Sequence, residues 1–295
     1  MTEVKAMAAK DFQAVIIGGG PAGVSAALYL ARANIKTAII ENGPGALAKA
    51  HKIENYYGST ASGLKLYAEG LEQAHSLGVT IIQDEVLGAE YFDSFMLTLK
   101  NHAEPLPAPV LILATGTKNI TLKVPGLAEL EGKGISYCAV CDGFFFRQKN
   151  VAVLGSGSYA LHEAEYLKHV AASVTVLTNG SNEALAKAAG FNTISTPLAK
   201  VSGENKLAAI HFTDGSTLAA DGLFIAIGTA DSTDIARKLG AQINGRFISV
   251  DTEGATNIPG LFAAGDCTGG LMQVAKAVHD GAKAGLAAIK FIRTK

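Results

Sequence analysis

Three residues near the middle of the chain have the types and the spacing that redox chemistry requires. Cys138 and Cys141 are separated by two residues, and Asp142 follows directly. Two cysteines at this spacing can close a small disulfide ring, which is easier to reduce than a buried structural bridge. The carboxyl group of Asp142 can supply or accept the proton that thiol–disulfide exchange needs. These residues therefore predict a redox-active dithiol with an acid beside it.

The same cysteine spacing also occurs in half of a zinc site, which is the alternative interpretation. A structural zinc site needs a second pair of ligands, and the remaining cysteine, Cys267, stands alone in the sequence. None of the seven histidines forms the closely spaced pair of a zinc finger with a neighbour. We therefore favour the dithiol, expect no metal, and expect Cys267 to be a small buried residue.

A nucleotide-binding turn is predicted near the N-terminus. Residues 12–17 form a short apolar run rich in β-branched side chains, which is typical of a buried strand. The run leads into Gly18, Gly20 and Gly23, spaced as G-x-G-x-x-G, and then into helical periodicity over residues 24–32. Gly18 allows a tight turn, Gly20 lets the backbone approach a pyrophosphate, and Gly23 lets the helix pack on the strand.

The next strand completes this pattern. It covers residues 37–40 and ends at Glu41, whose carboxylate can accept hydrogen bonds from an adenosine ribose. The N-terminus of the intervening helix then faces the phosphates. A strand, a glycine turn, a helix, a second strand and a carboxylate in this order indicate a dinucleotide site much more specifically than the glycines alone.

A second dinucleotide-binding unit follows the cysteines. A strand at 151–154 leads into the turn Gly155 to Ala160, in which an alanine takes the third glycine's place, and a partner strand lies at 174–177. The end of that strand, Thr178-Asn179-Gly180-Ser181, offers neither a carboxylate for a ribose hydroxyl nor an arginine for a 2′-phosphate. The fold of the unit is predicted, but its usual specificity residue is missing.

Length, composition and charge limit the possible functions. A chain of 295 residues, 48% of them hydrophobic, is long enough for two domains with substantial cores. The balance of 25 Lys and Arg against 26 Asp and Glu leaves no large basic surface for nucleic acid. No apolar run is long enough to span a membrane. The first ten residues have no apolar core of a secretory signal, and the few cysteines favour a cytoplasmic location.

Over nearly its full length the sequence resembles the low-molecular-weight thioredoxin reductases. The motifs that match are Gly18 to Gly23, Glu54-Asn55, Ala114-Thr115-Gly116, Cys138 to Gly143, Gly155 to Ala160, and Ala264-Gly265-Asp266. The resemblance implies an α/β fold with two Rossmann-like dinucleotide-binding domains of the three-layer ββα type, the second inserted into the first. It also implies a split FAD-binding domain at 1–118 and 246–295, a pyridine-nucleotide-type domain at 119–245, and a homodimer.

The resemblance also implies roles for individual residues. Cys141 would face the flavin, Cys138 would attack the disulfide of thioredoxin, and Asp142 would be the acid. Asp266 would bind the ribitol chain of FAD, and Asn55 would lie near the isoalloxazine ring. The positions expected to bind FAD are Gly18, Gly20, Pro21, Ala22, Gly23, Glu41, Asn55, Thr115, Gly116, Gly265, Asp266, Gln273 and Val274.

Three departures concern the electron donor. Members that use a pyridine nucleotide bind its 2′-phosphate with a His-Arg-Arg cluster where this chain has Thr178-Asn179-Gly180. The segment that follows is shortened, and Met272 replaces the usual arginine before Gln273. These features resemble the ferredoxin-dependent flavin thioredoxin reductases, so we expect ferredoxin as the donor and a degenerate nucleotide site. A ferredoxin at about −400 mV and a thioredoxin at about −270 mV make the transfer favourable by about 6 kcal/mol for two electrons.

Alternative functions stay open at this point. The first is an NADH- or NADPH-dependent disulfide reductase, and the second is a flavin redox sensor that does not turn over. A ferredoxin–NADP reductase of related fold is disfavoured because such enzymes lack the dithiol. Phe144 to Phe146 are expected to pack and present the dithiol, or to contact thioredoxin. The basic residues that could attract an acidic ferredoxin are Lys118, Lys123, Lys133, Arg147 and Lys149.

Overall fold

The computed structural model consists of two compact units. The residues that it describes are 12–117, 122–230 and 232–294. One unit contains residues 1–118 and 231–295, and the other contains residues 119–230. The N-terminal segment Met1 to Lys10 and the basic residue Lys118, both considered above, lie outside the described residues.

The return to the first unit comes earlier than the sequence suggested. Residues 231–245, which we expected in the inserted domain, belong to the first unit. Helix α6 (Ser232–Lys238) packs against strands β6 (Val86–Tyr91) and β19 (Phe247–Ile248), both of which are in that unit. The turn at Asn244-Gly245 connects two short strands within the first unit and is not the place where the chain enters that unit.

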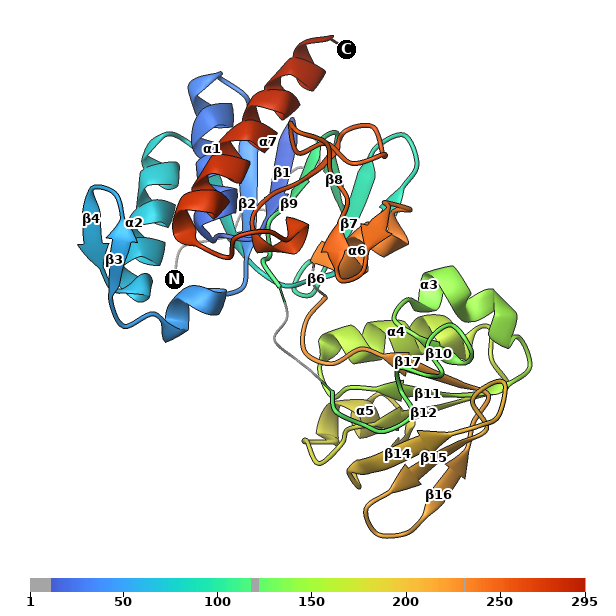
Figure 1. The fold of residues 1–295 in the computed structure, drawn as a ribbon. Coiled ribbons are helices and arrows are strands. Elements are labelled where there is room, and N and C mark those ends of the chain that lie inside the picture. The colour runs from blue at the N-terminus through green and yellow to red at the C-terminus, as the bar shows by residue number, and fades with distance from the viewer. Residues whose placement is uncertain (1–11, 118–121, 231, 295) are drawn as a thin grey trace. The chain divides into compact units, whose positions relative to one another are not determined.

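The first unit is built on a five-stranded parallel sheet (Figure 1). Its strands, in order across the sheet, are β20 (Leu261–Ala263), β9 (Leu111–Leu113), β1 (Ala14–Ile17), β2 (Thr37–Glu41) and β5 (Thr80–Gln83). In the centre, Ile16 pairs with Ile39 on one side and with Ile112 on the other. All residues of β1 and β2 are buried, as expected for parallel strands covered on both faces.

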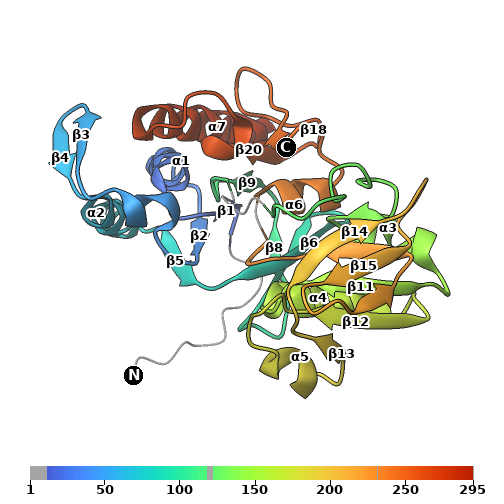
Figure 2. The same ribbon diagram turned by 60° about the horizontal axis from the view of Figure 1, so that its bottom comes forward.

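Helices α1 (Pro21–Arg32) and α7 (Val274–Thr294) pack against each other on the same side of this sheet (Figure 2). A Cβ atom at Gly281 would lie 2.1 Å from the carbonyl oxygen of Ala22, so only glycine permits this approach. Helix α2 (Gly63–Ser76) begins after Ser62, whose side chain accepts a hydrogen bond from the N–H of Lys65 at 3.2 Å. Ser62 is therefore the N-cap of this helix.

The first unit also contains smaller elements. Strand β6 continues into an antiparallel sheet with β7 (Phe95–Leu99) and β8 (Leu106–Ala108). The others are η1 (Gly45–Lys49), β3 (Ile53–Tyr56), β4 (Ser59–Ala61), β18 (Ile243–Asn244) and η3 (Asp266–Thr268).

The second unit repeats the parallel design. Its sheet has the order β10 (Ile135–Ser136), β17 (Gly222–Ile225), β11 (Asn150–Leu154), β12 (Ser173–Leu177) and β13 (Asn192–Ile194). The remaining strands, β14 (Leu198–Ser202), β15 (Ala209–Phe212) and β16 (Thr217–Ala219), form an antiparallel sheet. The helices are α3 (Ala139–Asp142), η2 (Gly143–Phe146), α4 (Ser158–Lys168) and α5 (Ala184–Ala188).

Two parallel sheets, each with a glycine turn between a central strand and a helix, confirm the predicted fold class. A hairpin turn at Asp214-Gly215 connects β15 and β16. Among the described residues, no helix is both long enough and apolar enough to cross a membrane.

Candidate active site

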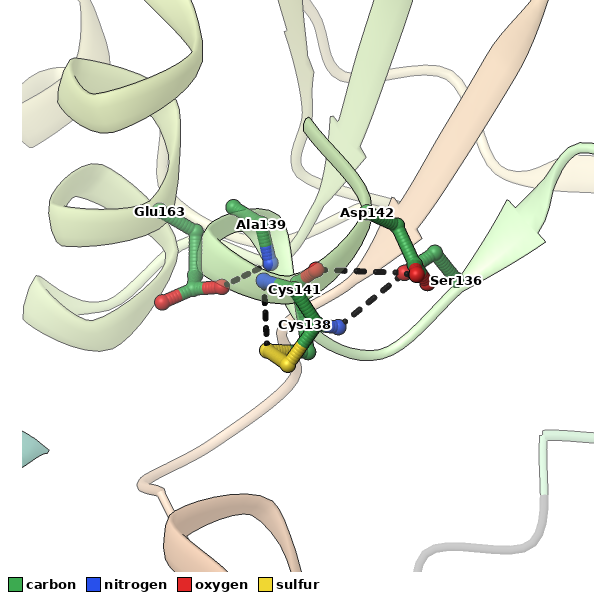
Figure 3. Close-up of a disulfide and its surroundings, with 6 residues drawn as sticks. All are labelled: Ser136, Cys138, Ala139, Cys141, Asp142 and Glu163. Carbon is green, nitrogen blue, oxygen red and sulfur yellow. Dashed lines mark hydrogen bonds between the residues drawn. A yellow bond between two sulfur atoms is a disulfide. The ribbon is translucent and has the colours of Figure 1, made fainter. Parts of the chain in front are cut away.

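The two cysteines of the C-x-x-C motif form a disulfide in the second unit (Figure 3). Cys138 is the N-cap of helix α3, and its Sγ accepts a hydrogen bond from the N–H of Cys141 at 3.1 Å. Cys138 is buried and Cys141 is exposed. The disulfide excludes zinc binding by these two cysteines in this oxidised state, because a cysteine that binds zinc must be a thiolate. No cluster of His, Cys, Asp and Glu suited to a metal occurs within the described ranges.

The acid next to the disulfide is held by a residue that the sequence analysis missed. The hydroxyl of Ser136 donates a hydrogen bond to Asp142 Oδ2 at 2.7 Å. The hydroxyl oxygen of Ser136 also accepts a hydrogen bond from the N–H of Cys138 at 3.1 Å. Ser136, on strand β10, therefore connects the carboxylate of Asp142 to the backbone of the first cysteine. Ser136 lies only two residues before Cys138, but a serine at that place belongs to no motif used in the sequence analysis.

A second missed residue lies on the other side of the dithiol. Glu163, on helix α4, is 2% exposed and accepts a hydrogen bond from the N–H of Ala139 at 2.8 Å. Figure 3 shows its carboxylate opposite the pair formed by Ser136 and Asp142. Its place on a helix of mixed composition gave no signal of this contact.

The three phenylalanines after the dithiol divide between two roles. Phe146 packs edge-on against Phe224, with the ring centroids 5.2 Å apart. Phe144 and Phe145 are each 68% exposed, and the guanidinium of Arg147 lies over the Phe144 ring. Packing therefore accounts for Phe146, whereas the first two leave an exposed aromatic surface next to the cysteines.

In the first unit, the glycine turn has the geometry that the sequence predicted. Gly18 has a φ of 116°, and an added Cβ there would lie 2.3 Å from the carbonyl oxygen of Ala114. A Cβ at Gly23 would lie 1.8 Å from the carbonyl oxygen of Gly18. At Gly20 the space is open, with no atom within 4 Å of an added Cβ. Gly18 and Gly23 thus serve close packing, whereas Gly20 leaves room for a ligand.

Helix α1 begins directly after Gly20, and Pro21 and Ala22 lie in its first turn. No side chain of the described residues caps this helix. Its N-terminal N–H groups can therefore bind a phosphate.

The carboxylate of Glu41 ends strand β2, as predicted. It is buried, and it accepts hydrogen bonds from the N–H of Gly43, at 2.8 Å, and from the hydroxyl of Tyr67. Burial and the neighbouring Glu41 carboxylate raise the pKa of the Tyr67 phenol, which therefore stays a donor. Tyr67, on α2, is a further residue that the sequence analysis missed.

In the first unit, Asn55 and Gln273, two residues expected to bind FAD, contact each other. The amide of Asn55, on β3, donates a hydrogen bond to Gln273 Oε1 at 2.8 Å. Val274 is the first residue of helix α7. Met272, in the position of the expected arginine, is exposed.

The turn that carries Gly265 and Asp266 is bound to helix α7 by one lysine. Lys276 Nζ donates to the carbonyl oxygens of Gly265, at 2.8 Å, and Gly269, at 2.5 Å, and it pairs with Asp280 Oδ2 at 2.7 Å. Burial raises the pKa of the Asp266 carboxyl, and the positive charge of Lys276 opposes that shift. Cys267, next in the chain, is a fully buried thiol, as expected.

Thr115 and Gly116, also expected to bind FAD, lie after β9. The Thr115 hydroxyl accepts a hydrogen bond from the N–H of Ser232 at 2.7 Å, and the Thr115 N–H donates to Ser232 Oγ at 3.0 Å. The side chain of Thr115 is thus committed to Ser232. At Gly116, as at Gly20, no atom lies within 4 Å of an added Cβ.

These features fit FAD. The first unit combines an uncapped helix N-terminus, an open backbone position at Gly20, a buried carboxylate at Glu41 and a half-buried carboxylate at Asp266. The helix N-terminus and Gly20 match a pyrophosphate, Glu41 matches an adenosine ribose, and Asp266 matches a polyhydroxyl chain.

The second unit has a polar pocket at the carboxyl ends of β12 and β13. The residues that line it are Gly180, Ser181, Asn182, Glu183, Ser195, Thr196, Pro197 and Asp214. Two carboxylates face the pocket, and no lysine or arginine is among these residues. The side chain of Asn179, at the pocket's edge, accepts a hydrogen bond from the N–H of Leu198 at 2.8 Å.

Comparisons with known proteins agree with this site. The model of the pyridine nucleotide-disulphide oxidoreductase family matches residues 12–281. A thioredoxin reductase of Treponema pallidum is 35% identical, over 96% of this chain and 98% of that protein. The crystal structure of an atypical thioredoxin reductase from Desulfovibrio vulgaris Hildenborough matches with a TM-score of 0.90 and 41% identity, covering 96% of this chain and 99% of the other. A ferredoxin-flavin thioredoxin reductase from Clostridium acetobutylicum matches with a TM-score of 0.71 and 26% identity, covering 96% and 99%.

The chain therefore belongs to the pyridine nucleotide-disulphide oxidoreductase family. Within that family its place is among the low-molecular-weight thioredoxin reductases, and the cofactor of these flavoproteins is FAD.

Proposed function

We propose that this thioredoxin reductase takes electrons from reduced ferredoxin and passes them through FAD and the Cys138–Cys141 pair to the disulfide of thioredoxin. The observation that carries the proposal is the Cys138–Cys141 disulfide, with Asp142 held beside it by Ser136. A disulfide with a positioned acid is what a protein needs to exchange electrons with another disulfide. A sensor that does not turn over has no need of such an acid.

FAD, when bound, supplies a store in which electrons delivered singly are collected for a disulfide, which accepts two. The first turn of α1 and Gly20 would bind the pyrophosphate. Glu41 would bind the adenosine ribose, and Asp266 would bind the ribitol chain. The bonded pair Asn55 and Gln273 would lie at the ring.

At the dithiol the proposed steps balance in electrons and protons. Two electrons break the Cys138–Cys141 bond, and two protons are taken up as both sulfurs become thiols. Cys138 gives its proton to the Asp142 carboxylate and attacks one sulfur of the thioredoxin disulfide, so a mixed disulfide forms and a thioredoxin thiolate leaves. Asp142 passes that proton to the leaving sulfur. Cys141 then loses its proton to Asp142 and attacks the Cys138 sulfur, which restores the intramolecular disulfide. The second thioredoxin sulfur leaves as a thiolate and takes up that proton.

The two cysteines differ in solvent exposure, and the role proposed for Cys138 requires its exposure to change. Attack by Cys138 on another protein requires that its sulfur become exposed, whereas Cys138 is 3% exposed here. The exposed aromatic rings of Phe144 and Phe145 support a docking surface for thioredoxin beside the dithiol. Aromatic side chains of this kind are enriched where proteins meet.

The choice of ferredoxin as donor is supported by the polar pocket of the second unit. Glu183 and Asp214 face the place where the His-Arg-Arg cluster of the pyridine-nucleotide-dependent members would bind a 2′-phosphate. Glu183 forms an ion pair with Lys187, which leaves Asp214 as the carboxylate whose negative charge opposes a 2′-phosphate. The likeness to a protein named as a ferredoxin-flavin thioredoxin reductase supports the same donor. Of the basic residues considered for docking, Lys123, Lys133, Arg147 and Lys149 are exposed.

One observation favours NADH as a second candidate donor. The glycine turn of the second unit is intact, since a Cβ added at Gly157 would meet only the carbonyl oxygen of Gly228, at 3.5 Å, and Gly155 packs against the carbonyl oxygen of Ala226. A carboxylate near the end of the second strand can accept hydrogen bonds from an unphosphorylated ribose, and Glu183 is placed there. This alternative shares every later step of the proposed reaction.

Anaerobic titration distinguishes the donors. The purified flavoprotein is mixed in turn with reduced ferredoxin, NADH and NADPH, and bleaching of the flavin absorbance is followed in a stopped-flow instrument. We expect fast bleaching with ferredoxin only. Equally fast bleaching by NADPH at physiological concentration would overturn the choice of donor, and fast bleaching by NADH would select the second candidate. The homodimer and the cytoplasmic location stay predictions, which gel filtration and cell fractionation test.

A further inference from the structure

A buried carboxylate lies next to the dithiol and has no part in the steps proposed above. Glu163 is 2% exposed, whereas Glu165 on the same helix is exposed and pairs with Lys168 in solvent. Removing a carboxylate from water costs several kcal/mol unless its partners compensate. One partner of Glu163 is the N–H of Ala139, the residue that directly follows Cys138.

The contact fixes the disulfide ring from a second side. The N–H of Cys138 donates to Ser136 Oγ at 3.1 Å, and the next N–H, that of Ala139, donates to Glu163 Oε2 at 2.8 Å. These two side chains come from β10 and α4, so two separate elements bind consecutive backbone groups of the motif (Figure 3). A hydrogen bond to a charged acceptor is about twice as strong as a neutral one.

The charge of Glu163 has a consequence once the disulfide is reduced. Breaking the S–S bond with two electrons leaves two sulfurs that are either thiols or thiolates, and only a thiolate attacks a disulfide. A nearby negative charge disfavours the thiolate. The titratable and charged groups packed around α3 are Asp142 on α3 itself, Glu163 and Tyr166 on α4, and Arg147 after η2.

The charges of Asp142 and Arg147 lie in different surroundings from that of Glu163. The carboxylate of Asp142 is bonded to Ser136, and the guanidinium of Arg147 lies over the Phe144 ring in an exposed position. Charges in exposed positions are screened by water and salt, whereas a buried charge is screened much less. Glu163 therefore places a buried carboxylate beside the dithiol, on the N–H of the residue that follows Cys138.

We infer that Glu163 is a positioning residue that holds the dithiol segment and that its charge holds back ionisation of the reduced thiols. A thiol that ionises less readily gives a thiolate of higher intrinsic nucleophilicity, and it is less exposed to oxidation by small oxidants. The inference rests on the proposed function in assigning exchange with thioredoxin to these cysteines.

The test measures the ionisation of the thiols directly. Reduced holoprotein is alkylated with iodoacetamide across a pH series, for the wild type and for the variants E163Q, E163D and E165Q. E163Q keeps the shape and removes the charge, whereas E163D keeps the charge and withdraws it by one methylene. E165Q removes an exposed charge from the same helix and is the matched control.

We expect E163Q to alkylate about tenfold faster than the wild type below the thiol pKa, which corresponds to one pKa unit. E163D should fall between the two, and E165Q should match the wild type. A role in packing alone would not move this pH profile. Coinciding profiles of E163Q and the wild type would overturn the inference. If E163Q yields no folded protein, a profile of E163D equal to that of the wild type overturns it instead.

The same samples keep the two proposals distinguishable. Wild-type protein, once reduced, is mixed with oxidised thioredoxin, and the thioredoxin thiols are counted. Failure of this transfer would contradict the proposed function, while the alkylation profiles would still decide the role of Glu163.

Discussion

The side-chain amide of Asn55 donates a hydrogen bond of 2.8 Å to Gln273, a residue 218 positions away in the sequence. The bond joins strand β3 to the residue before helix α7. Both residues were expected near the flavin ring, but from separate motifs. Their contact shows that the fold brings two of the predicted cofactor positions together.

This pair should contribute to FAD binding as a unit. We expect N55A and Q273A each to weaken FAD binding to the deflavinated protein by about fivefold, because the loss of either side chain frees the other. The double variant should lose less than the sum, with a coupling energy of about 1 kcal/mol. Fluorescence titration with FAD measures these constants, and Q73A on the exposed face of α2 is the control. Strict additivity would show that the two residues act separately.

Two glycines of the first turn should respond in opposite ways to alanine. A methyl group at Gly23 would meet the carbonyl oxygen of Gly18 at 1.8 Å, so G23A should unfold at a much lower temperature. A methyl group at Gly20 meets no protein atom within 4 Å, so G20A should keep its melting temperature and lose FAD affinity by tenfold or more, that is, by about 1.4 kcal/mol. Thermal unfolding of the apoprotein and FAD titration separate the two effects. Normal FAD binding by G20A would contradict the assignment of Gly20 to the pyrophosphate.

The carboxyl group of Asp266 should lower the stability of the apoprotein at neutral pH. Its pKa in the folded protein is raised, mainly by burial, so the folded state binds this proton more tightly than the unfolded state does. The stability that it contributes is therefore present below the unfolded pKa and is lost as the pH rises through the folded pKa. D266N, which cannot ionise, should melt at a higher temperature than the wild type at pH 7 and at the same temperature below about pH 4. A lower melting temperature of D266N apoprotein at pH 7 would refute this.

The pair formed by Ser136 and Asp142 should control proton transfer at the dithiol. We expect D142N to reduce thioredoxin turnover by about a hundredfold, the lower end of what a positioned acid contributes. S136A should have a smaller effect in the same direction, because the carboxylate stays but loses the hydroxyl that holds it. Steady-state assays across a pH series test both, with S173A, at the exposed first position of β12, as a control. Unchanged turnover of D142N would remove Asp142 from the mechanism.

Much of the fold was accessible from local sequence patterns. Apolar runs next to glycine turns identified β1, β2, β11 and β12 to within a residue or two, because buried parallel strands are continuously apolar. Short edge strands such as β10, β13 and β14 were missed, since a few residues with mixed polarity carry no clear period. The point at which the chain returns to the first unit was also missed. Helix α6, which follows that point, has only seven residues and is too short to show a clear period.

The site shows the same division. The cysteines, the acid and the glycines are recognised by spacing along the chain. Tyr67 and Glu163 are not, because each acts through a contact that exists only after separate elements pack. Ser136 and Lys276 act over short stretches of sequence, but neither belongs to a recognised spacing. Cys138 and Cys141 look equivalent in the sequence, and only the structure reveals that one is buried and the other exposed.

The most direct test of the central claim counts the electrons that the protein stores. Holoprotein is titrated anaerobically with dithionite, and reduction is followed by flavin absorbance and by thiol counting. The wild type should take up two electrons for FAD and two more for the Cys138–Cys141 bond, whereas C138S and C141S should each take up only the two of the flavin. Uptake that is equal in the wild type and both variants, or thioredoxin turnover that survives either substitution, would contradict the account.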